Sequence, residues 1–173
     1  MAGEYSRELS VKVVAGQCRL IGLGFRQGGS PGYGLRRQLI DEQRMPKAPL
    51  SPGERKSLQT DRVILRPGPA HEVDVVRRIY RYFVVQQKSE AEIAAELNLE
   101  GIGNEFGRPW TRGTIHQILT NEKYVGNNVY NRVSFKLKQK RIANPPEMCV
   151  RAEAVFDPVV DQDFFRAAKR IIY

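Results

Sequence analysis

The sequence predicts an α+β protein that is mainly helical: a long N-terminal helix, then a helix-turn-helix domain with small antiparallel β-hairpins. Three observations lead to this prediction. Apolar residues recur at helical spacing over five segments of the chain. Other segments form short extended runs or alternate apolar and polar residues, which is typical of strands. With 173 residues, 41% of them hydrophobic, the chain can bury one modest core, which argues against several independent domains.

The first expected element is an amphipathic helix over residues 4–23. Leu9, Val13 and Leu20 recur there at roughly helical spacing among charged residues, and two glycines close together end the segment. Residues 28–34 then hold four glycines and a proline, a composition that excludes a regular helix or a central strand. We interpret this segment as a linker or an irregular turn.

Two short extended runs, residues 33–40 and 62–66, flank a polar stretch, residues 41–61, that contains three prolines. We expect a hairpin with a long flexible loop at its tip. After the Pro-Gly-Pro sequence at residues 67–69, a second helix should cover about residues 70–87. Its buried stripe should consist of Val73, Val76, Ile79, Tyr80 and Phe83.

A third helix is expected over residues 89–99. Ser89 and Glu92 form a capping box, in which each side chain accepts a hydrogen bond from the backbone NH of the other residue at the helix start. Ile93 and Leu97 should face the core. The helix therefore has a defined beginning and one apolar side.

A glycine-rich turn, residues 101–107, leads to a fourth helix over residues 111–121, for which Thr111 can act as the N-cap. We expect Trp110 to be a core anchor rather than a base-stacking group. The two helices have the layout of a helix-turn-helix over about residues 89–121, with a turn longer than the tightest form. The inward stripe of its second helix should be Ile115, Ile118 and Leu119.

The C-terminal third predicts a hairpin over about residues 127–153 and a terminal helix over about residues 161–172. Alternation favours a strand from residue 129 onward, and a return strand at 148–153 should follow a turn at Asn144-Pro145-Pro146. Asp161 should cap the terminal helix. The apolar side of that helix should consist of Phe164, Phe165, Ala168 and Ile171.

The formal net charge of +9 indicates a polyanionic partner, such as nucleic acid or an acidic membrane surface, with mere solubility as the alternative. Residues 108–141 hold eight basic residues against Glu122 alone, so +7 of the net charge lies there. Because cations that neutralise phosphates release counterions, this basic face favours duplex DNA. The phosphate candidates in and after the helix-turn-helix are Arg108, Arg112, Lys123, Arg132, Lys136 and Lys138.

A helix that reads bases in the major groove needs polar or small residues opposite its core stripe. Gln117 could pair with adenine, and Gly113 would let the backbone approach the duplex closely. His116 is either a DNA contact or an ordinary surface histidine, and Arg112 either holds a phosphate or belongs to a solvated face. The candidates on the helix are Gly113, Gln117 and Thr120 opposite the core, with Thr114, His116 and Asn121 beside them.

Several other classes of protein are disfavoured. The two cysteines, Cys18 and Cys149, lie far apart without CxxC spacing, so we expect no metal site, no disulfide framework and a reducing cytoplasm. No apolar run approaches the roughly 18 residues that span a bilayer, so no membrane partner is expected. Both histidines stand alone, and no clustered carboxylates or phosphate loop are present. We therefore expect no catalytic residue and no cofactor, and an enzyme is the weakest hypothesis.

One set of residues runs through the helix-turn-helix and just beyond it: Ile93, Ala94, Leu97, Asn98, Gly101, Ile102, Gly107, Arg108, Pro109, Trp110, Thr111, Ile115, Ile118, Leu119, Asn121, Tyr124 and Gly126. Together these residues resemble the recombinase domain of large serine recombinases. Residues 29–34 look like the start of the same domain, so the resemblance covers roughly residues 27–173. Residues 4–26 are similar to the long helix that joins the catalytic and DNA-binding domains of such proteins. The resemblance implies a connecting helix at 1–26 and a DNA-binding domain at 27–173.

The resemblance implies that the chain recognises one half of a recombination site in double-stranded DNA, with residues 111–121 in the major groove and residues 28–34 along the adjacent minor groove. Arg26 and Arg36 become phosphate or minor-groove candidates. The full-length protein would be a homo-oligomer on bacterial or phage DNA. Because the catalytic serine domain and the zinc-binding domain of the family do not match, we expect an excised or truncated segment without activity of its own.

Two further functions stay open. A stand-alone transcription regulator would use the same helix-turn-helix but would need its own dimer interface. An RNA-binding protein would use the same basic hairpin, and competition between duplex DNA and structured RNA would separate the two.

Overall fold

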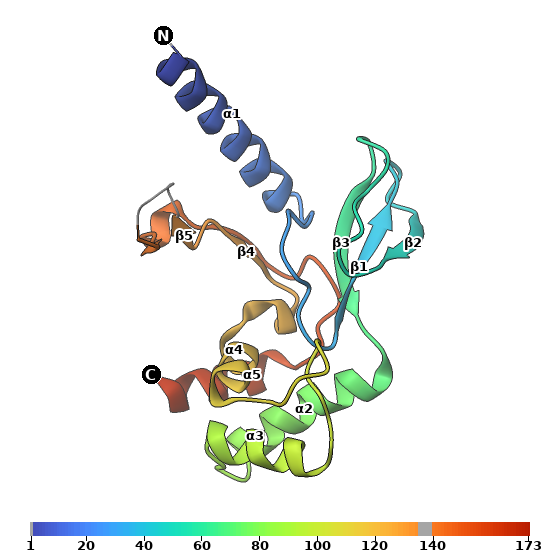
Figure 1. Ribbon diagram of the computed structural model, residues 1–173, viewed down its shortest axis with the longest axis vertical. Helices are drawn as coiled ribbons and strands as arrows, with labels where there is room; N and C mark the ends of the chain where they lie inside the picture. The colour runs from blue at the N-terminus through green and yellow to red at the C-terminus, as the bar shows by residue number, and fades with distance from the viewer. Residues whose placement is uncertain (1, 135–139) are drawn as a thin grey trace.

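A computed structural model describes residues 2–134 and 140–173. Most helices pack together at one end, and a long helix and two β-ribbons extend from them (Figure 1). The mainly helical α+β class is therefore confirmed. The helices are α1 (Ala2–Gly22), α2 (Ala70–Val84), α3 (Glu90–Leu99), α4 (Arg112–Thr120) and α5 (Gln162–Ile172), with 3-10 helices η1 (Glu122–Val125) and η2 (Pro146–Met148). The strands are β1 (Leu35–Ile40), β2 (Pro46–Leu50), β3 (Arg62–Pro67), β4 (Asn128–Tyr130), β5 (Val133–Ser134), β6 (Ile142–Ala143) and β7 (Val150–Ala152).

The hydrophobic core lies between α2, α3, α4 and α5. The stripe expected on α2 is buried, as are those of α3 and α4, because each sequence keeps one apolar face at the helical period. Tyr80 lies in the middle of the core, where its hydroxyl donates a hydrogen bond to the carbonyl oxygen of Ile118 at 2.8 Å. The core thereby fixes α4 against α2.

Trp110 is a core anchor, as expected, with 3% of its surface exposed. Its ring meets Tyr33 edge-on, with 4.9 Å between the ring centroids. Asn98 holds the backbone on both sides of the residue: its Nδ2 donates to the Trp110 carbonyl oxygen at 2.9 Å, and the Trp110 NH donates to Asn98 Oδ1 at 2.7 Å. The end of α3 is thus tied to the start of α4 across the glycine-rich turn.

The expected hairpin is present, with Leu35 opposite Pro67 and Ile40 opposite Arg62 in an antiparallel β1–β3 pair. The prediction of a long loop between these strands was wrong in part, because β2 forms within residues 41–61 and pairs with β1. Its prolines concealed the strand. An edge strand accepts proline because one side of its backbone has no ladder partner.

The second ribbon pairs β4 with β7 and β5 with β6. Its return therefore begins before Asn144, and the predicted position of the turn at Asn144-Pro145-Pro146 was wrong: Pro146–Met148 forms η2 within the returning half. The sequence pattern misplaced the turn because β6 is only two residues long. Lys136 and Lys138 lie outside the described residues.

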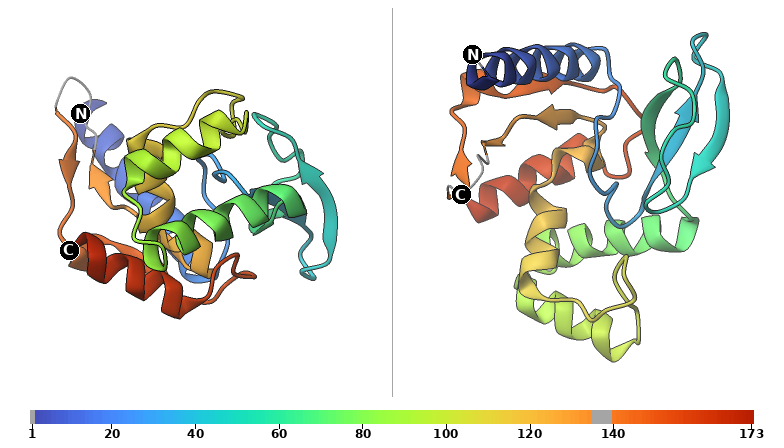
Figure 2. Two further views of the ribbon diagram at one scale, coloured as in Figure 1. Left: turned by 90° about the horizontal axis from the view of Figure 1, so that it is seen from below. Right: turned by 45° about the horizontal axis from the view of Figure 1, so that its top comes forward.

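The helix expected over residues 4–23 is present as α1, Ala2–Gly22, and it lies along the ribbon that contains β4 and β7 (Figure 2). Its apolar residues are largely open to solvent: Leu9 and Val13 are about half exposed, and Ile21 near the C-terminal end is fully buried. The Tyr130 hydroxyl donates to Gln17 Oε1 and connects the helix to β4. Within the described part of the chain, no helix is both long and apolar enough to cross a membrane.

Helix α5 closes the core from the C-terminal end. Asp161 occupies the predicted N-cap position, although its side chain makes no capping hydrogen bond. Phe165 and Ala168 are buried, and Ile172 packs beside them. The expected apolar side was wrong at Ile171, which is 54% exposed, because the seven-residue step from Phe165 falls on Ile172.

Candidate nucleic-acid interface

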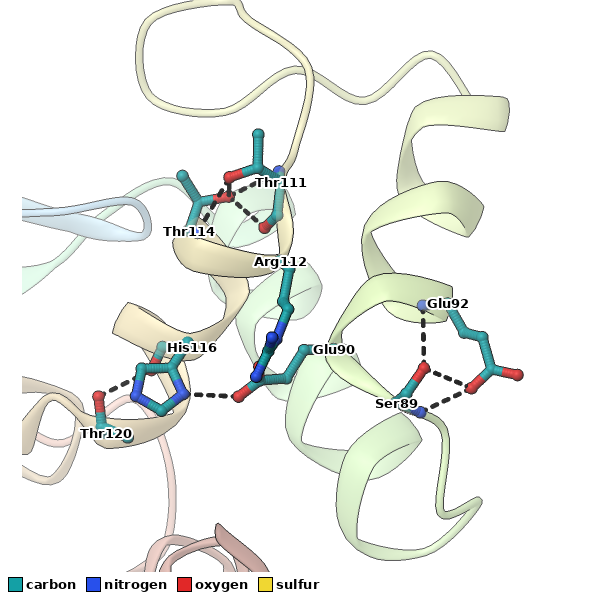
Figure 3. A network of polar contacts seen from close by, with 8 residues as sticks. All are labelled: Ser89, Glu90, Glu92, Thr111, Arg112, Thr114, His116 and Thr120. Carbon is teal, nitrogen blue, oxygen red and sulfur yellow. Dashed lines mark hydrogen bonds and ion pairs between the residues drawn. The ribbon is translucent and has the colours of Figure 1, made fainter.

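The helix-turn-helix begins each of its helices with a capping box (Figure 3). At α3, Ser89 and Glu92 form the predicted box. At α4, Thr111 Oγ1 accepts a hydrogen bond from the Thr114 NH at 3.2 Å, and Thr114 Oγ1 accepts one from the Thr111 NH at 2.9 Å. Thr114 is one of the predicted groove-facing residues, but its hydroxyl caps the start of α4.

One edge of α4 presents its residues to solvent as expected. Arg112, Gly113 and Gln117 are exposed. The space beside Gly113 is open, since a Cβ atom added there would have Thr111 Oγ1, at 3.9 Å, as its nearest contact. Gly113 and Gln117 are four residues apart and share one helix face. This edge combines an amide side chain with bare backbone.

The Glu90 carboxylate, at the first residue of α3, joins the two helices (Figure 3). Its Oε2 accepts a hydrogen bond from Arg112 Nε at 3.1 Å, and its Oε1 lies 2.6 Å from His116 Nδ1. Glu90 has 10% of its side chain exposed, whereas Arg112 has 79% and His116 has 43%. Arg112 is thus held by one edge of its guanidinium while the rest of the side chain faces solvent.

Glu90 is not among the site residues that the sequence predicts. The sequence shows three glutamates in α3 and one arginine in α4, but the pairing joins residues 22 and 26 positions apart. No local periodicity connects such positions. The contact became apparent only when the two helices were placed side by side.

Two other groove candidates use their polar atoms within the protein. The Thr120 hydroxyl donates to the His116 carbonyl oxygen at 2.7 Å. Asn121 Oδ1 accepts a hydrogen bond from the Lys123 NH at 3.2 Å and caps η1. These side chains stabilise the C-terminal end of α4.

Lys123 is turned toward the glycine-rich linker, residues 28–34. Its ammonium donates to the carbonyl oxygen of Ser30 at 3.0 Å and to that of Pro31 at 3.4 Å. Burial, together with the positive charge of Arg26, lowers the pKa of Lys123 to about 8. The group therefore lies in a poorly solvated position against the linker backbone.

Arg36 is committed to an ion pair with Glu72 of α2. Its two terminal nitrogens bind the two carboxylate oxygens at 2.9 and 2.7 Å, and the Gly34 NH donates to Glu72 Oε2 at 3.1 Å. Burial alone would raise the pKa of Glu72, but the bonds from Arg36 and Gly34 outweigh it and lower that pKa. The same bond with Glu72 raises the pKa of Arg36. This pair fastens the end of the linker to α2.

Arg26, at the other end of the linker, donates from Nη1 to Asn128 Oδ1 at 3.4 Å, and burial lowers the pKa of its guanidinium. Arg108 and Arg132 are exposed, and their side chains make no hydrogen bond or ion pair with any residue that the structure describes. Among the residues that the structure describes, the predicted cations therefore divide into a solvent-facing set around α4 and the ribbon, and a linker set bound to other groups of the protein.

The exposed edge of α4 offers hydrogen-bond donors, the amide of Gln117 and the cations of the neighbouring arginines. Among residues 2–134 and 140–173, no group of three His, Cys, Asp or Glu residues is placed to hold a metal ion. An exposed helix edge flanked by arginines is suited to a polyanion with hydrogen-bonding groups on its surface.

Comparisons with known proteins find a matching family and similar solved structures. Residues 70–173 match the protein family described as Recombinase. The chain is similar to a solved structure described as "Crystal Structure of a LSR-DNA Complex", with a TM-score of 0.55 and 17% identity over 93% of this chain and 38% of that one. It is also similar to a structure described as "Sequence Requirements of the Listeria innocua prophage attP site", with a TM-score of 0.54 and 18% identity over 93% of this chain and 51% of that one. No curated protein matches significantly.

The chain spans 38% of the length of the first structure and 51% of the length of the second. At these identities the likeness shows a shared fold. The family match shows more than a shared fold, because it covers more than half of the chain. It includes α2, α3, α4 and α5 with the whole helix-turn-helix. On this match, the chain belongs to the Recombinase family.

Proposed function

We propose that this chain is the DNA-binding region of a site-specific serine recombinase and that it recognises one half of a recombination site in duplex DNA. The observation that carries the proposal is the solvent-facing edge of α4, with Arg112, Gly113 and Gln117 exposed on the second helix of a helix-turn-helix. The likeness of the fold to a recombinase–DNA complex supports it.

In this proposal α4 enters the major groove. The Gln117 amide makes paired hydrogen bonds with an adenine edge, and the bare backbone at Gly113 allows close approach. Arg108 and the solvent-facing part of Arg112 bind phosphates beside the helix start, where contacts fix register rather than sequence. His116, held by Glu90, lies at the margin of this contact.

The remaining parts act around this helix. Residues 28–34 follow the adjacent minor groove, and Arg132, together with Lys136 and Lys138, adds phosphate contacts. Residues 1–26 form the connecting helix and residues 27–173 the DNA-binding domain. The cleavage chemistry and a homo-oligomeric assembly on bacterial or phage DNA belong to the whole protein.

The test begins with duplexes selected from a random-sequence library, followed by a gel-shift titration. The double variant Arg112→Ala/Gln117→Ala should bind the selected duplex about 100-fold more weakly, because each lost contact is worth roughly 1–3 kcal/mol. The matched control removes the same residue types from α5, as Gln162→Ala/Arg170→Ala, and should bind like wild type. Unchanged affinity and base preference of the first variant would contradict the docking.

Two further measurements separate the alternatives. Structured RNA that displaces the selected duplex at equal concentration would favour an RNA-binding protein. Light scattering that shows a stable dimer of the free chain would favour a self-sufficient transcription regulator.

A further inference from the structure

The linker between α1 and β1 is bound to the rest of the protein, because two consecutive residues of η1 donate hydrogen bonds to its backbone. Lys123 donates to the carbonyl oxygens of Ser30 and Pro31, and the Tyr124 hydroxyl donates to the carbonyl oxygen of Tyr33 at 2.8 Å. Tyr124 is 3% exposed, so this second bond is inside the protein. The 3-10 helix η1, which follows α4 directly, thus holds the linker.

The fit of the linker against this grip is tight at Gly32. The residue has a φ of +94°, and a Cβ atom added to it would lie 3.3 Å from the Tyr124 hydroxyl oxygen. Any other L-residue would be strained in this conformation and would push against Tyr124. The linker therefore has one defined path across η1.

The Lys123 ammonium binds the linker backbone and is not directed to solvent, where it could reach a phosphate. A cation that served only to reach DNA would be exposed, like Arg108 in the turn before α4. The Lys123 side chain is instead half-buried. The positive charges of Arg26 and Arg132 lower its pKa, and the negative charge of Glu105 opposes them. Two carbonyl oxygens of the linker compensate for that environment.

We propose that Lys123 is a positioning residue: it fixes the path of the linker across η1, directly after the helix-turn-helix, and so sets where the linker meets DNA relative to α4. This inference rests on the proposed function for its effect on DNA, whereas the anchoring itself concerns the free protein. Lys123 then acts on the duplex through the linker backbone, and its own charge does not neutralise a phosphate.

The first measurement is amide hydrogen exchange of the free protein. Lys123→Met keeps the aliphatic stem and removes the charge and the donors. It should speed exchange at the Gly32 and Leu35 amides about tenfold, since these NH groups bind within the linker. The matched control, Arg108→Met, should leave both rates unchanged.

The second measurement is the salt dependence of binding to the library-selected duplex. Loss of one phosphate contact reduces the slope of log K against log salt concentration by about 0.9. Lys123→Met should weaken binding about tenfold with an unchanged slope, whereas Arg108→Met should reduce the slope. Gly32→Ala, which removes no charge, should reproduce the faster exchange and the unchanged slope, and it serves as a second variant if Lys123→Met fails to fold.

The outcomes decide between the roles. Unchanged exchange in both Lys123→Met and Gly32→Ala would overturn the anchoring, and a slope reduced as in Arg108→Met would make Lys123 a phosphate contact. If wild type binds no duplex, the proposed function fails and the effect on DNA fails with it. Faster exchange in the variants would even then support the anchor within the protein.

Discussion

Two carboxylates hold basic side chains in different parts of the molecule, and they do so differently. Glu72 of α2 uses both oxygens on Arg36 and accepts a third bond from the Gly34 NH, while Arg36 is 36% exposed. Glu90 of α3 binds Arg112 through Nε alone, and Arg112 is 79% exposed. Both terminal nitrogens of Arg36 are thus bound within the protein, whereas those of Arg112 remain available to a partner.

The difference shows that the presence of a basic residue in a DNA-binding region does not give its role. Arginine and lysine bind backbone carbonyls and carboxylates with the same groups that bind phosphate. Around α4 these groups face solvent, and along the linker they face the protein. The linker region gains a fixed path, and the α4 region retains a surface for a partner.

The largest effect that would test this comparison is on stability. Glu72→Gln should lower the free energy of unfolding by about 2 kcal/mol, because it weakens charge-assisted bonds at a largely buried position and leaves Arg36 without a counter-charge. Glu90→Gln, the matched change, should cost about 0.5 to 1 kcal/mol because its arginine partner is solvated. Urea denaturation of both variants measures the difference. Equal losses would remove the distinction between the two carboxylates.

An intermediate effect concerns the pH dependence of stability at Lys123. Its pKa is lowered from 10.5 to about 8 in the folded protein, so the unfolded chain binds more protons between these values and the free energy of unfolding rises with pH there. From pH 7 to 9.5 this contribution should be roughly 1 to 2 kcal/mol. Lys123→Met should lack it when the two proteins are compared at each pH. Parallel curves would show that the ammonium is well solvated.

The smallest effect concerns Gly113. Gly113→Ala has open space for its methyl group and should raise the free energy of unfolding by roughly 0.5 kcal/mol through helix propensity. Gly16→Ala in α1, where the added Cβ also meets nothing, controls for that gain. If the α4 backbone approaches the duplex, Gly113→Ala should nevertheless bind several-fold more weakly in the gel-shift titration. Tighter binding in step with the gain in stability would place the groove contact elsewhere on the helix.

Much of the fold was predictable because its signals are local. The stripe of α2, the cap at Ser89 and the inward residues of α4 lie within a few turns of one helix, and all were found. Strand β2 was missed because its prolines are acceptable only at a sheet edge, and an edge is a property of the sheet. Ile171 was misplaced because one residue on a helix turns a side chain by about 100°.

The exposed part of the site was predictable for the same reason, whereas the partners of its cations were not. The exposure of Gln117 and Gly113 follows from the helical period once the core stripe is known, and the structure agrees. The partners of Arg36 and Lys123 lie 36 and 92 or 93 positions away in the chain. No spacing rule relates residues so distant, because their approach depends on how the helices and the linker pack.

By itself the sequence determined the helices, their caps, their buried faces and the concentration of positive charge between residues 108 and 141. Only the tertiary structure decided which of those charges remain available to a partner. The reason is physical: periodicity and capping depend on neighbours within one or two helical turns, whereas the partner of a long cationic side chain depends on which backbone carbonyls and carboxylates the folded chain brings within about 3 Å of it.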